Sequence, residues 1–319
     1  MFSQDTPRRF SCQPSGPFDL ANQNRHFGGW PTLPGKAGAI VMAFPVEGSE
    51  HAAAAVIRQG ADRAITGEVH GCPDELADAA GRQSLAAISL DVDGSGWPEV
   101  GSRDPVIGRL QASYGYLRPT LFHSPYEAAC AFVIGHRISI RQTRALRARL
   151  AAELGTAVTI AGERFDAFPT PGQLLAADAL PGINPTKTER LRAIARATQE
   201  GWLSREPLRE MQPEAALAKI QTLPGIGPFF AQGILYRGAG TVDTLTCDPI
   251  TSHAITHAYE LKTAPDQQML EHIAQAWRPY RMWTVVLLHV WARTELGLPP
   301  RRAARNTRVR QPGDRPPAR

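Results

Sequence analysis

The sequence lacks the cysteine pattern of a metal-binding or disulfide-rich protein. Its four cysteines lie far apart and form no C-x-x-C pair; they are Cys12, Cys72, Cys130 and Cys247. This spacing offers neither a zinc ligand set nor the ligands of an iron–sulfur cluster. We therefore expect reduced thiols, as in a cytosol.

Long apolar runs and a secretion signal are also absent. No run approaches the ~18 apolar residues of a membrane span, and the MFSQ start has no basic segment followed by an apolar stretch. We therefore expect a cytoplasmic protein with no membrane contact. Hydrophobic residues make up 43% and charged residues 20% of the chain, which excludes wholesale disorder and collagen-like or coiled-coil architecture.

The basic excess is confined to the end of the chain. The formal net charge is +5, but residues 301–319 hold seven arginines against one aspartate, and residues 1–300 hold 28 basic and 29 acidic side chains. The tail has almost nothing apolar, so we expect it to be disordered and to add nonspecific attraction for phosphates. The overall basicity alone is a poor reason to predict nucleic-acid binding.

The first third of the chain predicts a small antiparallel sheet. Short apolar runs bounded by Gly, Pro or Asp are typical of strands, and they lie at 39–46, 55–59, 63–69 and 85–94. One helix is expected near 74–83. Residues 1–35 are rich in Gly, Pro, Asn and Gln without periodicity, which predicts a loosely ordered segment.

After Pro119 the pattern changes to helices with clear start and stop signals. Capping boxes begin at Ser124, Ser139 and Thr186. Glycines that end helices are expected at Gly155, Gly201 and Gly238. Further helices are expected over 186–199, 213–220, 228–237, 249–261, 265–276 and 280–295.

The helix that begins at Ile140 has two different faces. Leucines recur every four residues on one face and arginines lie on the other; the leucines are Leu146, Leu150 and Leu154, and the arginines are Arg141, Arg144 and Arg147. The chain is thus predicted to be α+β, mainly α, with an all-helical domain preceded by a sheet domain. The expected divisions are 1–35, 36–118, 119–300 and 301–319.

The stretch LPGIGP at 223–228 lies between two predicted helices. Two glycines around one apolar residue allow a tight hairpin whose main-chain amides stand at a helix N-terminus, a geometry that binds phosphate. An ordinary interhelical turn is an equally good interpretation of this pattern alone.

Downstream, Asp248 stands directly before Pro249. Asp followed by Pro is a good helix N-cap. A helix N-terminus also favours the ionised carboxylate, which is what a cationic transition state needs. The segment 273–283 adds aromatics and cations at the junction of two helices, with core packing as the alternative interpretation.

Four collinear segments together carry a family resemblance. They are AFVIGHRISIRQTRALRARLAAELG at 131–155, PGINPTKTERLRAIARA at 181–197, LPGIGPFFAQGI at 223–234 and IAQAWRPYRMW at 273–283, with Asp248 placed 23 residues after Gly225. The chain resembles the helix-hairpin-helix DNA glycosylases, and within them the 3-methyladenine DNA glycosylase II type. The resemblance covers roughly residues 85–295 and extends faintly into the sheet domain.

The resemblance implies roles for particular residues. The hairpin would grip a phosphate beside the lesion through Gly225 and Gly227, with Thr222 next to them. Asp248 would be the catalytic carboxylate. An aromatic wall for the extruded base would come from Trp277, Phe229 and Phe230. Main-chain carbonyls would hold a structural Na⁺ or K⁺, those of Gln221, Leu223 and Ile226; no cofactor is otherwise required.

The chain departs from the family pattern at two places. Where relatives usually show Gln followed by a second Gln or an apolar wedge, it has His136 and Arg137, so a cationic, planar side chain would fill the gap left by a flipped base. We expect His136 and Arg137 to contact DNA, together with Arg141 and Arg144. The nucleophilic Lys of bifunctional relatives is replaced by Phe229, which predicts a monofunctional enzyme.

The resulting hypothesis is a monofunctional glycosylase that removes alkylated purines of the 3-methyl or 7-methyl type. It would flip the base out of duplex DNA and hydrolyse the N-glycosidic bond with the help of Asp248, in base excision repair. The expected partner is duplex DNA with a damaged base, bound by a monomer that is associated with the nucleoid. Two alternatives stay open: a non-catalytic DNA-binding or damage-sensing protein, and a glycosylase for deaminated or oxidised bases.

Overall fold

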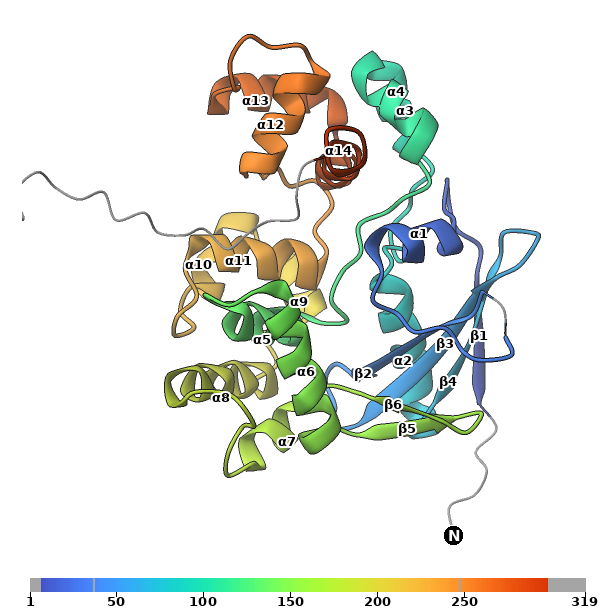
Figure 1. The fold of residues 1–319 in the computed structure, drawn as a ribbon, viewed down its shortest axis with the longest axis vertical. Coiled ribbons are helices and arrows are strands. Elements are labelled where there is room, and N and C mark those ends of the chain that lie inside the picture. Colours follow the sequence, from blue (N-terminus) through green and yellow to red (C-terminus); the bar gives the residue numbers. More distant parts are fainter. Residues whose placement is uncertain (1–6, 37, 247, 298–319) are drawn as a thin grey trace, which may run out of the picture.

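The computed structural model describes residues 7–36, 38–246 and 248–297 (Figure 1). The predicted basic tail at 301–319 lies outside them. The fold combines a small antiparallel sheet with many short helices, so the predicted mainly α, α+β class is confirmed. None of the described helices is long and apolar enough to cross a membrane.

A four-stranded antiparallel sheet forms the N-terminal part. Its order is β1–β4–β3–β2, with β1 at Arg8–Cys12, β2 at Ile40–Pro45, β3 at Ala52–Gln59 and β4 at Ile65–His70. Helix α2, Asp74–Ala86, covers one face, and both faces of β2 and β3 are buried. Burial of both faces explains why these strands are continuously apolar in sequence.

Two expectations for this part are wrong. Residues 85–94 form no strand, because α2 runs to Ala86 and turns follow it. The fourth strand is β1, from the segment expected to be loosely ordered. That segment also forms α1, Leu20–Phe27, and buries Phe18 and Leu20 in the sheet core. Its few apolar side chains are ordered by long-range contacts that local periodicity does not reveal.

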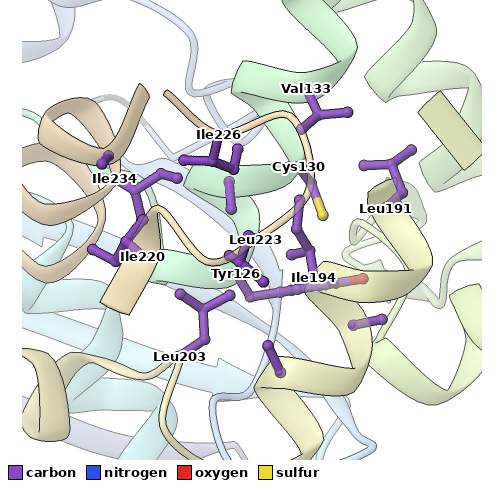
Figure 2. Close-up of a cluster of buried hydrophobic side chains, with 14 of the residues drawn as sticks. Tyr126, Cys130, Val133, Leu191, Ile194, Leu203, Ile220, Leu223, Ile226 and Ile234 are labelled. Atoms are coloured by element: carbon purple, nitrogen blue, oxygen red, sulfur yellow. The ribbon is translucent and has the colours of Figure 1, made fainter. Parts of the chain in front are cut away.

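The middle of the chain forms a helical cluster around one apolar core (Figure 2). Its helices are α5 (Pro125–Gly135), α6 (Ile140–Leu154), α7 (Pro171–Ala176), α8 (Pro185–Gln199), α9 (Arg205–Glu210), α10 (Pro213–Ile220) and α11 (Pro228–Ile234), which continues as the π-helical turn η1 (Leu235–Ala239). This core contains Leu191 and Ile194 of α8, Ile220 of α10 and Ile234 of α11.

The sequence predicts that this region is entirely helical, but it also contains two strands. A hairpin of β5, Ala157–Ile160, and β6, Glu163–Asp166, lies between α6 and α7. Val158 and Ile160 pack against Val41 and Val56 on the face of the sheet opposite α2. The hairpin therefore ties the helical region to the N-terminal sheet.

The boundary predicted at residue 118 does not match the packing. Helices α3, Trp97–Arg103, and α4, Pro105–Tyr114, pack with the last helices of the chain rather than with the sheet (Figure 1). Those partners are α12 (Pro249–Ala258), α13 (Gln267–Ala274), the short η2 (Gln275–Trp277) and α14 (Arg281–Glu295). The large aromatics Trp97 and Trp283 meet edge to face in this cluster, 5.7 Å between ring centroids.

Most of the predicted helix ends are correct, and two are wrong. Ser124 caps α5, and Ser139 forms a reciprocal capping box with Gln142 at the start of α6. Helix α8, however, is capped by Asn184, because Pro185 takes the first helical position ahead of Thr186. Gly155 and Gly201 follow α6 and α8 as expected. Gly238 lies inside η1, which ends instead at Gly240.

Candidate active site

The hairpin at 223–227 joins α10 to α11. Leu223 and Ile226 point into the helical core, only 6% and 5% exposed (Figure 2). Gly225 and Gly227 are exposed. Gly225 has φ +79°, and a Cβ there would lie 2.4 Å from Nε of Arg190. The left-handed backbone conformation therefore favours glycine at this position, and a Cβ would in addition displace the Arg190 side chain.

Helix α11 begins at this hairpin. Gly227 is its N-cap, and no atom lies within 4 Å of a Cβ built on it. The amide of Ala231 donates to Gly227 O and closes the first turn, so the amides ahead of it lie at the positive end of the helix. Thr222 is exposed and donates its hydroxyl to Lys219 O at 2.7 Å. Phosphate binding here stays a prediction.

The predicted cation ligands lie on the same hairpin. The carbonyl of Leu223 accepts the amide of Ile226 at 3.1 Å, and since a carbonyl oxygen has two lone pairs, one remains for a cation. Together with the carbonyls of Gln221 and Ile226, this oxygen suits a hard monovalent ion. This site also stays a prediction. Among the described residues, no cluster of three His, Cys, Asp or Glu side chains could hold a metal ion.

Asp248 caps α12, as predicted. Its Oδ1 accepts the amides of Ile250 and Thr251, each at 2.9 Å, and the hydroxyl of Thr251 at 3.3 Å. His289 of α14 places Nε2 3.4 Å from the same oxygen. These donors favour the ionised carboxylate, and the side chain is still 24% exposed. The charge is therefore held in place at the surface.

An aromatic cluster lies beside the hairpin. The ring of Phe230 is 5.3 Å from that of Phe132, 5.6 Å from His136 and 5.9 Å from Phe229. Phe229 is 48% exposed, an unusual position for a large apolar side chain. Gly233 makes room for this packing, because a Cβ there would lie 2.2 Å from the Phe132 ring. The cluster joins α5 and α11 and presents an aromatic face to solvent.

Trp277 does not belong to this aromatic face. It is fully buried in the cluster formed by α3, α4 and the last helices, where Nε1 donates to Asp104 at 2.9 Å and lies 3.2 Å from the Tyr259 hydroxyl. The prediction that it stacks on an extruded base is therefore corrected. Core packing, the alternative that the sequence left open, is what the structure has.

The turn between α5 and α6 holds His136 and Arg137. Arg137 is exposed and has φ +62°, which is uncommon for a residue other than glycine. Lys187 Nζ donates to Ile134 O at 2.7 Å and to His136 O at 3.0 Å, so the ammonium group of this lysine is turned toward the protein. Partial burial, helped by Arg190, lowers its pKa. Burial also lowers the pKa of His136, as do the charges of Arg137, Arg190 and Lys187.

Helix α6 follows the turn and carries the predicted arginine face. Arg141 and Arg144 are exposed, but Arg147 turns inward and pairs with the buried Glu127 at 2.9 Å. Its guanidinium also lies 5.3 Å from the centre of the Phe122 ring. Arg147 is thus part of the packing between α5 and α6 rather than of the basic face.

His289 could not be found from the sequence. It lies within the apolar run VVLLHVW of α14, where a histidine reads as a core residue. Only its position 3.4 Å from Asp248 in the structure shows that it belongs to the site. The two residues are 41 positions apart in the chain, so the sequence contains no sign of this contact.

Comparison with known proteins finds similar sequences and similar folds among DNA glycosylases. No family model matches the chain. The chain is 31% identical over 196 residues to DNA-3-methyladenine glycosylase 2 of Escherichia coli (strain K12), covering 58% of this chain and 63% of that relative. It thus spans less than two thirds of the length of this relative.

Solved structures share the fold. A 3-methyladenine DNA-glycosylase from Archaeoglobus fulgidus superposes with a TM-score of 0.70 at 21% identity, covering 90% of this chain and 98% of that one. The resemblance to helix-hairpin-helix DNA glycosylases is confirmed. An 8-oxoguanine glycosylase/lyase from Clostridium acetobutylicum, in complex with double-stranded DNA, shares the glycosylase fold with a TM-score of 0.63 at 14% identity, over 86% and 92% of the two chains.

Proposed function

We propose that this protein is a monofunctional DNA glycosylase that removes 3-methyl or 7-methyl purines from duplex DNA in base excision repair. The observation that carries the proposal is Asp248, a carboxylate held by three donors at a helix N-terminus in a chain with a glycosylase fold. The relatives named as 3-methyladenine glycosylases support the choice of alkylated bases.

The chemistry follows from what alkylation does to a purine. A methyl group at N3 or N7 makes the base a good leaving group, and the glycosidic bond breaks through an oxocarbenium-like transition state. Asp248 stabilises this positive charge and orients, or takes a proton from, the water that attacks C1′. The carboxylate needs no reorganisation, because the α12 amides already fix it.

Reaching the bond requires the nucleotide to leave the helical stack. Flipping costs a few kcal/mol and less for a damaged pair. The exposed Phe229, backed by Phe230 and Phe132, offers a face on which a cationic, electron-poor base stacks. Arg137, held outward in the turn after α5, fills the gap that the base leaves.

The remaining contacts serve the phosphate backbone. The hairpin amides near Gly225 and Gly227 bind one phosphate, with Thr222 beside them, and a bound Na⁺ or K⁺ stabilises the hairpin from its carbonyl side. The exposed Arg141 and Arg144 add sequence-independent attraction. A monomer suffices for all of these contacts, and the partner is duplex DNA with one damaged base.

A panel of duplexes, each with a single defined lesion, tests the proposal. We expect release of 3-methyl and 7-methyl purines by the wild-type protein. Asp248→Asn should keep the helix cap and DNA binding but slow release at least 100-fold, or about 2.7 kcal/mol. Release by that variant at the wild-type rate would contradict the role of Asp248.

The same panel separates the alternatives. The shared fold with an 8-oxoguanine glycosylase/lyase favours including oxidised bases, and deaminated bases complete the set. If the protein releases only oxidised or deaminated bases, its substrates are those bases and not alkylated purines. Tight binding to a lesion duplex without release of any base would identify a damage-sensing protein instead.

A further inference from the structure

Three side chains form a connected path from α14 to the start of α12. Nε2 of His289 lies 2.8 Å from Oγ1 of Thr251 and 3.4 Å from Oδ1 of Asp248. Thr251 is fully buried, and the His289 side chain is only 19% exposed. The path therefore runs through the protein interior to the carboxylate of the proposed active site.

The negative charge of Asp248 sets the direction of these hydrogen bonds. A lone pair on Nε2 would face the carboxylate at 3.4 Å, which is repulsive, so Nε2 carries the hydrogen and donates to Thr251 Oγ1. The Thr251 hydroxyl then donates to Asp248 Oδ1 at 3.3 Å. With the two helix amides on the same oxygen, Oδ1 is surrounded by donors, which favours the ionised form.

Helix capping alone does not require this arrangement. An aspartate at the N-cap needs only the backbone amides that follow it, and those of Ile250 and Thr251 already serve Asp248. The hydroxyl and the imidazole add a second, side-chain anchor from another helix. Such outer partners fix the orientation of a reacting group and tune its charge, as around metal ligands.

We infer that Thr251 and His289 are positioning residues that hold the Asp248 carboxylate in its reactive orientation. This inference rests on the proposed function. It deepens that function, because it names the side chains that make a capping aspartate a prepared electrostatic group. Neither residue needs to touch DNA, since both act through Asp248.

Isosteric pairs of variants test the path. Thr251→Val removes the donor and keeps the shape, whereas Thr251→Ser keeps the hydroxyl. His289→Leu removes the imidazole donor, and His289→Gln retains an N–H of similar reach. Thr256→Val is the matched control on the same helix, because the Thr256 hydroxyl donates only to Ser252 O among the described contacts.

The readouts separate a positioning role from a merely structural one. The single-turnover rate of 7-methylguanine release is measured at saturating protein, together with the Kd for a duplex carrying an abasic-site analogue and the midpoint of thermal unfolding. We expect Thr251→Val and His289→Leu to slow release about tenfold with an unchanged Kd, and the Ser and Gln variants to recover most of the rate. Thr256→Val should match the wild type.

Two outcomes overturn the inference, and they can be told apart. If the wild type is active and Thr251→Val and His289→Leu both release the base at the wild-type rate, the positioning role alone is overturned. The same holds if the Val and Ser variants of Thr251 lose the same amount of rate. A wild type that releases no base from any lesion overturns the proposed function and, with it, this inference.

Discussion

Lys187 at the start of α8 donates its ammonium hydrogens to the main-chain carbonyl of His136 at the end of α5. A helix leaves its last carbonyls without partners inside the helix. The lysine supplies a charged donor for His136 O and, at 2.7 Å, for Ile134 O. Helix α8 thereby fixes the turn that presents Arg137, the residue proposed to enter the base stack.

Replacing this lysine should weaken both the fold and the reaction. Lys187→Met keeps the aliphatic stem and loses two charge-assisted hydrogen bonds, which should cost about 1.5–3 kcal/mol. We expect a lower urea midpoint and slower base release, because Arg137 is no longer held in place. Lys262→Met, at an exposed position, is the control. Equal urea midpoints for the two variants would contradict this role of Lys187.

The buried ion pair of Glu127 predicts a stability change in acid. Burial would raise the pKa of Glu127, but His123 and Arg147 outweigh it, and the pKa lies below its ordinary value of 4.5. The unfolded chain thus binds its proton first, so stability from this group is present above about pH 4.5 and is lost as the pH falls. Urea unfolding of Glu127→Gln should show lower stability at pH 7 but a flatter fall between about pH 5 and pH 3. Parallel curves would show that other carboxylates dominate.

The type of product depends on Phe229. A bifunctional glycosylase attacks the sugar with an amine and forms a Schiff base, which a phenyl ring cannot do. The ammonium of Lys187 is engaged by two carbonyls. We therefore expect an intact abasic strand that is cleaved only after alkali. A covalent protein–DNA adduct trapped with borohydride would contradict the monofunctional assignment.

Salt dependence should reveal which arginines meet phosphates. The logarithm of the binding constant falls linearly with the logarithm of the salt concentration, and each lost phosphate contact lowers the slope by about 1. Arg141→Gln and Arg144→Gln should each lower it, and deletion of 301–319 should lower it further without changing the preferred lesion. Arg82→Gln, exposed on α2, should leave it unchanged. Unchanged slopes in the α6 variants would mean that this face is only solvated.

Trp277 should matter for stability rather than for base recognition. Trp277→Phe removes the hydrogen bond from Nε1 to Asp104 and leaves a smaller ring in the core, which should cost about 2–4 kcal/mol. Below its lowered unfolding midpoint, the variant should release bases at a rate near that of the wild type. A large loss of rate in a fully folded variant would restore the original base-stacking prediction.

Local signals in the sequence predicted much of the helical fold. Proline at the first helical position and capping residues such as Ser139 and Asp248 act within a few positions of the helix they begin, so their effect is visible in the chain itself. Strands β2 and β3 are equally clear in the sequence, because both of their faces are buried and their residues are continuously apolar. The candidate carboxylate followed from the same local logic.

Contacts between distant parts of the chain could not be predicted. Strand β1 has alternating, mostly polar residues and is ordered by pairing with β4. The sequence around Trp277 predicts a binding-site aromatic, whereas in the structure its Nε1 donates to Asp104, 173 positions earlier in the chain. His289 likewise has meaning only beside Asp248. In each case the deciding neighbour lies in another element, and periodicity within one element contains no information about it.

The packing of α3 and α4 against α12 and α14 has a consequence during protein synthesis. Trp97 leaves the ribosome roughly 190 residues before its ring partner Trp283, which corresponds to about 10 to 40 seconds at ordinary bacterial and eukaryotic elongation rates. During that interval the apolar side of both early helices has no native cover. We therefore expect the nascent chain to be open to chaperones until the final helix emerges, and the yield to depend on translation speed through the last third of the message.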